Sequence, residues 1–113
     1  MRLSTLQYHV NAYMKKSPWL NFFMDYDPSG DITKTLCPVM AINGERDVQV
    51  ISSLNLIGIK GHLTENPKNF VKEYPALNHL FQHCTTGNVS EYRMIEETIS
   101  PEVLEDIVRF IKQ

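Results

Sequence analysis

The first third of the chain carries apolar residues at helical spacing. In residues 3 to 14 they recur every three or four positions, which predicts an amphipathic helix with one apolar stripe. Ser17 followed by Pro18 is typical of a helix N-cap with proline at the first helical position, so we expect a second, short helix from there. A proline and a glycine a few residues further on break the pattern. We therefore predict a helical lead-in over residues 1–31.

The second helix is unusually rich in large apolar side chains for so short an element. Its sequence WLNFFM and the residues just after it contain Trp19, Phe22, Phe23 and Tyr26. This is too much apolar surface for a solvated turn, so we expect these side chains to lie in the core. In a complete enzyme, the same residues could instead line a substrate pocket.

From residue 32 onward the pattern predicts a strand, a helix and a second strand. The continuous apolar run at residues 39–42 is typical of a strand buried on both faces, as in a parallel sheet. Residues 50–63 have helical spacing and are followed by an Asn-Pro pair that ends the helix. Residues 69–74 alternate and predict a second strand, nearer a sheet edge. These elements together form a βαβ unit.

The last part of the chain predicts a long connection and a helix. Residues 75–99 are too many for an ordinary connection, and such loops are usually functional or partly helical. After them Ser100 is expected to cap a helix with Pro101 at its first position and a broad apolar face. The sequence thus predicts one α/β domain over residues 1–113, in which 32–113 form a short parallel sheet flanked by helices.

Composition and charge narrow the range of partners. The 113 residues are 42% hydrophobic and 21% charged, which is typical of a globular domain. A net charge of −2 with scattered basic residues does not favour a nucleic-acid or membrane partner. No apolar run approaches the roughly 18 residues that a membrane helix needs. The N-terminus lacks the apolar segment of a signal peptide, which leaves a cytoplasmic location as the default expectation.

Two polar residues stand where a parallel sheet collects functional groups. Asp47 follows the first predicted strand and His79 follows the second. Because the carboxyl ends of neighbouring parallel strands meet at one edge of the sheet, we expect the two side chains within hydrogen-bonding reach. An aspartate that accepts from Nδ1–H of a histidine leaves Nε2 free to take a proton from a nucleophile. The alternatives are a turn or capping role for Asp47 and a simple surface histidine.

Three stretches of the chain resemble a known family. CPVMAINGERDVQV, LNHLFQHCTTG and SPEVLEDIVRFI look like the C-terminal third of an α/β-hydrolase. The closest group is the bacterial esterase and dienelactone-hydrolase-like serine hydrolases related to prolyl oligopeptidases, and the resemblance covers nearly the whole chain. It implies that Asp47 is the triad acid, that His79 is the base, and that ester or related acyl bonds are hydrolysed without a metal or organic cofactor.

The chain also departs from that family. In these enzymes the triad serine lies upstream of the acid, on a Gly-x-Ser-x-Gly turn, and no such motif is present here. The seven serines all lie in other contexts: Ser4, Ser17, Ser29, Ser52, Ser53, Ser90 and Ser100. We therefore expect a C-terminal fragment with an incomplete catalytic triad, inactive alone, that would bind a small ester or acyl substrate only within the complete enzyme.

The sequence gives weaker signals for a metal site or a nucleophilic cysteine near His79. His79 and His83 are spaced like two metal ligands on one helical turn, with Cys84 adjacent, but Leu80 stands where the metalloprotease motif needs glutamate. Cys84 could serve as a nucleophile, although nothing nearby in sequence would activate its thiol. We expect no metal site, and free thiols at Cys37 and Cys84.

The rival to a hydrolase segment is a non-catalytic interaction module. Two strands cannot cover the apolar faces of three or four helices, which would leave a strand edge and apolar surface exposed. We therefore expect a homo-oligomer, either a dimer or a strand-exchanged assembly, that shares sheet edges or helices between copies.

Overall fold

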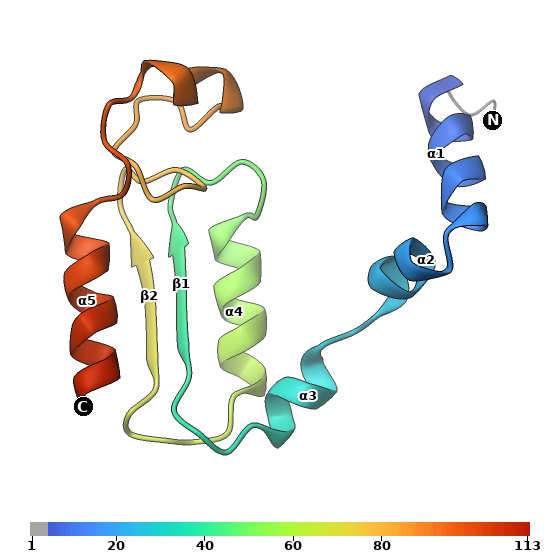
Figure 1. Cartoon of the computed structure of the whole chain (residues 1–113). Helices are drawn as coiled ribbons and strands as arrows, with labels where there is room; N and C mark the ends of the chain where they lie inside the picture. Colours follow the sequence, from blue (N-terminus) through green and yellow to red (C-terminus); the bar gives the residue numbers. More distant parts are fainter. Residues whose placement is uncertain (1–4) are drawn as a thin grey trace.

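The computed structural model describes residues 5–113, except the side chain of Met14, and divides them into an arm and an α/β unit (Figure 1). The arm, residues 5–26, contains the helices α1 (Thr5–Lys16) and α2 (Pro18–Asp25). The α/β unit, residues 29–113, contains every other element. Leu3, the first residue of the predicted apolar stripe, lies outside the described residues.

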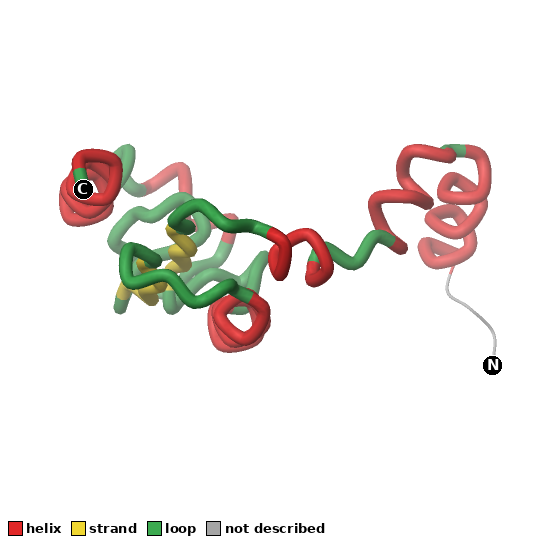
Figure 2. Tube along the Cα trace, turned by 90° about the horizontal axis from the view of Figure 1, so that it is seen from below, coloured by secondary structure: helices red, strands yellow, loops and turns green. Residues whose placement is uncertain are grey.

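The arm stands away from the rest of the molecule (Figures 1 and 2). The radius of gyration is 17.5 Å, against about 13 Å expected for a compact chain of this length. The predicted start of α2 is confirmed, because Ser17 Oγ accepts the Leu20 N–H at 3.2 Å and Pro18 opens the helix.

The aromatic side chains of α2 are exposed, so the prediction that they form core is wrong. Trp19 stacks on Phe23 with ring centroids 5.5 Å apart, and Phe22 stacks on Tyr26 at 5.4 Å. Trp19 nevertheless keeps 70% of its surface accessible. The reason is the position of the arm, which leaves these rings only one another to pack against.

A short helix, α3 (Ser29–Lys34), occupies the segment in which the sequence predicted a break. Pro28 is the N-cap residue of this helix, and Asp27 Oδ1 accepts the Ser29 N–H at 3.0 Å. Proline ends a helix that precedes it but is well tolerated at the start of the next one. The proline therefore marks where α3 begins.

The predicted parallel βαβ unit is confirmed, and the fold is a small α/β arrangement. Strand β1 (Met40–Gly44) leads through α4 (Ser52–His62) to β2 (Phe70–Tyr74), and the two strands pair in parallel. The C-terminal helix α5 (Pro101–Lys112) lies on the opposite side of the sheet from α4 (Figure 2).

The core lies between the sheet and α5. It consists of Tyr74, Leu77 and Val103, all almost fully buried, with half-buried apolar residues around them. The Tyr74 hydroxyl donates a hydrogen bond to Asp106 Oδ2 at 2.7 Å. Burial and this contact with Asp106 raise the pKa of Tyr74, so the phenol stays neutral and links β2 to α5.

Two details of the sequence prediction need correction. Strand β1 is not buried on both faces, because Met40 and Ile42 are only half-buried in a sheet of two strands. Ser100 is the N-cap residue of α5, but its buried hydroxyl has no hydrogen-bond partner within residues 5–113. The Ser100 N–H instead donates to the Phe81 carbonyl at 2.7 Å, which anchors α5 to the loop that precedes it.

The long connection after β2 is partly helical, as predicted. It contains the 3-10 helix η1 (Val89–Met94) and a single antiparallel bridge between Leu77 and His83. Of the helices in residues 5–113, none is both long enough and apolar enough to cross a membrane.

Candidate active site

Asp47 and His79 lie together at the carboxyl ends of the two parallel strands. Asp47 follows β1 and His79 follows β2, so the parallel pairing delivers both to one edge of the sheet. The distance between His79 Nδ1 and Asp47 Oδ2 is 2.8 Å. The structure therefore brings together the two residues that sequence reasoning singled out.

The carboxylate of Asp47 is held at both oxygens. Oδ1 accepts the backbone N–H groups of Gln49 and Val50, each at 2.8 Å. Burial raises the pKa of Asp47, but the hydrogen bonds from Val50, His79 and Gln49 outweigh it and hold that pKa below its usual value. Asp47 is therefore an ionised acceptor with a fixed orientation.

Asn43 braces the turn that carries Asp47. Its amide nitrogen donates to the Val50 carbonyl at 3.0 Å and lies 3.4 Å from Asp47 Oδ2. Its amide oxygen accepts from Asn55 of α4 at 2.8 Å. Asn43 is almost fully buried, and sequence reasoning missed it. The available signal was a polar residue directly after the apolar run of residues 39–42.

Gly44 allows the loop that carries His79 to pack against the end of β1. A Cβ atom at this position would collide with the carbonyl oxygens of Leu77 and Asn78. Beside it, the Arg46 N–H donates to the Leu77 carbonyl at 2.9 Å. The two segments that carry acid and base are therefore fixed to each other through the backbone.

His79 lies in a turn held by a buried asparagine. Asn78 Oδ1 accepts the N–H groups of Leu80 at 2.9 Å and Gln82 at 3.0 Å, and Asn78 Nδ2 donates to Gln82 Oε1 at 3.0 Å. Asn78 is completely buried, so this turn has few alternative conformations. The loop thus presents the imidazole from a fixed base.

The hydrogen bond to Asp47 determines the tautomer of neutral His79. An ionised carboxylate can only accept, so Nδ1 carries the proton and Nε2 carries the lone pair. Nε2 has no hydrogen-bond partner among residues 5–113, and 36% of the side chain is exposed. The arrangement can therefore accept a proton from an incoming group at Nε2.

No serine in the described part of the chain completes a triad. None of the serines in residues 5–113 forms a hydrogen bond with His79. Ser17 caps α2, and Ser52 donates to Glu73. The buried hydroxyl of Ser100 has no hydrogen-bond partner within residues 5–113, and Ser4 lies outside the described residues.

The geometry does not favour a metal site at His79 and His83 or a nucleophilic role for Cys84. His83 Nδ1 contacts Glu97 at 2.8 Å, so the two histidines face different carboxylates. Burial and the nearby Glu91 raise the pKa of Cys84, which keeps its thiol protonated. Cys37 and Cys84 are both free, as predicted. Within residues 5–113, no group of three or more histidine, cysteine or acidic side chains could hold a metal ion.

Comparisons with protein families, with curated protein sequences and with solved structures gave no significant match to this chain. The resemblance to α/β-hydrolases stays a prediction from the sequence.

Proposed function

We propose that Asp47 and His79 are the acid and base of a serine-hydrolase site that cleaves ester or related acyl bonds, as in an α/β-hydrolase. The observation that carries the proposal is the 2.8 Å contact between His79 Nδ1 and an Asp47 carboxylate fixed by two backbone N–H groups. The nucleophilic serine comes from outside these 113 residues, so the chain alone has no serine-dependent hydrolase activity.

The pair moves one proton in each half of the reaction. His79 Nε2 takes the proton of the serine hydroxyl while the serine oxygen attacks the acyl carbon of the substrate. The resulting imidazolium gives that proton to the leaving alcohol, and the acyl group stays on the serine. Water then loses a proton to Nε2, attacks the acyl-enzyme and releases the acid, and the proton returns to the serine oxygen.

Asp47 acts through the imidazole in both halves. Its lowered pKa keeps it ionised, so it holds Nδ1–H in place and stabilises the positive charge that forms on the ring. Asn43 and Gly44 are positioning residues, since they fix the acid turn and the base loop without contacting a substrate.

The reactivity of Nε2 can be tested on the chain as it exists. An imidazole with a free lone pair attacks p-nitrophenyl acetate, releases p-nitrophenolate and then loses the acetyl group to water. We expect His79→Ala to remove at least about half of the rate above buffer at pH 7, and Asp47→Asn to lower it as well. His83→Ala is the matched control, because His83 also contacts a carboxylate. Equal losses in His79→Ala and His83→Ala would contradict the proposal.

The place of the nucleophile needs a second measurement. After treatment with a fluorophosphonate, we expect the intact mass of the chain to stay unchanged. A stoichiometric adduct that disappears in both Asp47→Asn and His79→Ala would mean that a serine of this chain, or of a neighbouring copy, completes the triad. That result would contradict an external nucleophile.

A further inference from the structure

Strand β1 has one edge without a neighbouring strand. The hydrogen bonds from Phe70 N–H to the Val39 carbonyl and from Glu45 N–H to the Tyr74 carbonyl, both 2.9 Å, bracket the ladder between β1 and β2. Because alternate residues of a strand face opposite edges, the backbone groups of Ala41 face β2. Those of Met40 and Ile42 face the other edge, where residues 5–113 supply no strand.

A hollow runs along this open edge. Its volume is about 370 Å³, and four consecutive residues of the chain, 39–42, line it. Successive side chains of a strand point to opposite faces, so a hollow that touches all four reaches the strand from its edge. Apolar residues of the neighbouring helices, among them Ile32 of α3 and Ile59 of α4, form its walls.

Strand β1 has none of the charged or proline residues that usually prevent an edge strand from pairing with another chain. The strand MAING has no charged residue and no proline, whereas β2, FVKEY, carries Lys72 and Glu73. Charged residues, proline and bulges are the usual means by which an edge strand avoids pairing with another chain. The open edge of β1 is therefore the side of the sheet best suited to accept a strand.

We infer that this edge pairs with the same edge of a second copy of the chain, antiparallel, about a two-fold axis at Ala41. With the axis at Ala41, Met40 of one copy lies opposite Ile42 of the other copy, and Ile42 lies opposite Met40. This register exchanges four backbone N–H···O=C bonds and joins two sheets into one of four strands. Self-complementary pairing is the defining property of a closed two-fold dimer.

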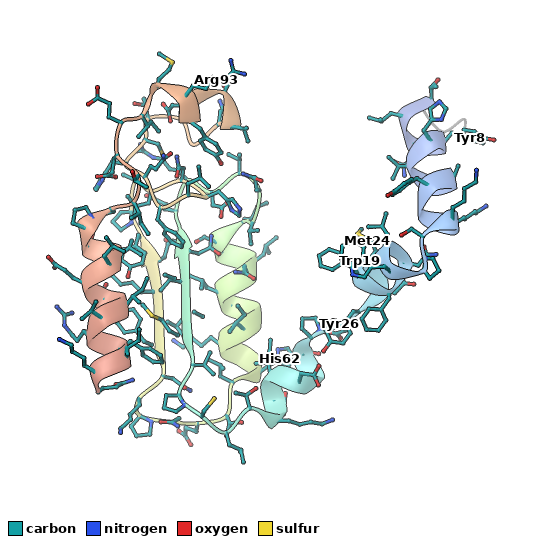
Figure 3. The ribbon with its side chains drawn as sticks, in the orientation of Figure 1. Tyr8, Trp19, Met24, Tyr26, His62 and Arg93 are labelled. Atoms are coloured by element: carbon teal, nitrogen blue, oxygen red, sulfur yellow. The ribbon has the colours of Figure 1, made fainter. Side chains whose placement is uncertain are left out.

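The arm lies on the side of the molecule where the second copy would sit. Figure 1 shows it leaving the α/β unit from α3, past α4, and Figure 3 shows Trp19, Met24 and Tyr26 on it, away from the sheet. Its exposed aromatic rings can cover the partner once the strands have paired. The two histidine sites lie at opposite ends of such a sheet, so the strand pairing does not bring them together.

A disulfide tests the register directly. In a background with Cys37→Ser and Cys84→Ser, Ala41→Cys places two thiols across a non-hydrogen-bonded pair, where Cα atoms are about 4.5 Å apart and a disulfide fits. We expect nearly complete cross-linking on mild oxidation. Val39→Cys is the matched control, because the same register holds its two copies too far apart to bridge. Equal cross-linking at both positions, or none at Ala41→Cys, would overturn the inference.

The mass in solution tests the same edge without cysteine. Sedimentation of the unmodified chain should give twice the 13.1 kDa of one copy. Met40→Pro removes an outward N–H of β1 and should yield a monomer, while Val71→Pro does the same at the outer edge of β2 and should leave the dimer. A monomeric wild type would overturn the inference. So would a dimer that survives Met40→Pro but is lost in the double variant Trp19→Ala and Phe23→Ala, because the arm alone would then hold it.

Discussion

The loop after β2 offers two histidine–carboxylate pairs that differ in how the acid is held. His79 contacts Asp47 and His83 contacts Glu97, in both cases through Nδ1 at 2.8 Å. The Asp47 side chain is 5% exposed and accepts two backbone N–H groups from its own turn. The Glu97 side chain is 30% exposed, and the backbone N–H it accepts belongs to His83 itself.

The difference shows that a short distance does not by itself make an acid–base couple. Within residues 5–113 the Glu97 carboxylate contacts only His83, the residue it would have to orient, although the Glu97 backbone carbonyl accepts from Gln82 Nε2 at 2.9 Å. Asp47 is fixed to β1 and α4 through Asn43, independently of His79. Only the arrangement around Asp47 can hold an imidazole in one orientation while the ring gains and loses a proton.

The largest effect should come from Gly44→Ala, which breaks the His79 pair and spares the His83 pair. The added Cβ collides with two backbone carbonyls, and overpacking of this kind costs about 1–3 kcal/mol. Urea unfolding measures the loss. Gly58→Ala in α4 is the control, since its Cβ meets nothing within 4 Å and should stabilise the helix by about 0.5–1 kcal/mol. Equal midpoints for the two variants would contradict the close approach at Gly44.

Asn43→Leu should have the next largest effect. It leaves the amide of Asn55 and the carbonyl of Val50 without their partner inside the protein, which costs about 1–2 kcal/mol. The exposed Asn88→Leu should change the free energy of unfolding by less than about 0.5 kcal/mol. If the two substitutions cost the same, Asn43 does not brace the acid turn.

The pH dependence of stability should report the ionisation of Asp47. The pKa of folded Asp47 lies below its unfolded value of 3.8, so its stabilisation is present above that pH and is lost as the pH falls through the folded pKa. The free-energy difference between wild type and Asp47→Asn should therefore shrink below about pH 4. Urea midpoints between pH 7 and pH 3 measure it, and a difference that grows toward acid would contradict the sign.

Glu97→Gln should have the smallest effect. The Glu97–His83 pair is accessible to solvent, and pairs of this kind contribute about 0–1 kcal/mol and weaken with added salt. The same unfolding experiment at low and high salt tests the contrast with Asp47. A larger loss for Glu97→Gln than for Asp47→Asn would reverse the comparison on which the proposed function rests.

Much of the α/β unit could be predicted from the sequence because its signals are local and strong. A continuous apolar run, a helical repeat and a proline-capped amphipathic helix predict their elements independently of what surrounds them. The Asp47–His79 contact then follows from the parallel pairing, because the carboxyl ends of the two strands lie side by side at one edge of the sheet.

The features that sequence reasoning missed depend on packing. Whether Trp19 and its neighbours are buried is decided by where the arm lies, which no local pattern contains. The role of Asn43 depends on α4 placing Asn55 beside it. The predicted break before Pro28 is present, but the helix α3 after it was missed, because proline both ends a preceding helix and starts a following one.

The tautomer of His79 is the most direct test of the account. Long-range ¹H–¹⁵N correlation of the histidine side chains at neutral pH reports which ring nitrogen carries the proton. We predict protonated Nδ1 and unprotonated Nε2 for His79, with that preference lost in Asp47→Asn and unchanged in Glu97→Gln. A His79 ring that carries its proton on Nε2, or that exchanges freely between the two forms in the wild type, would contradict the claim that Asp47 holds this imidazole ready to act as a base.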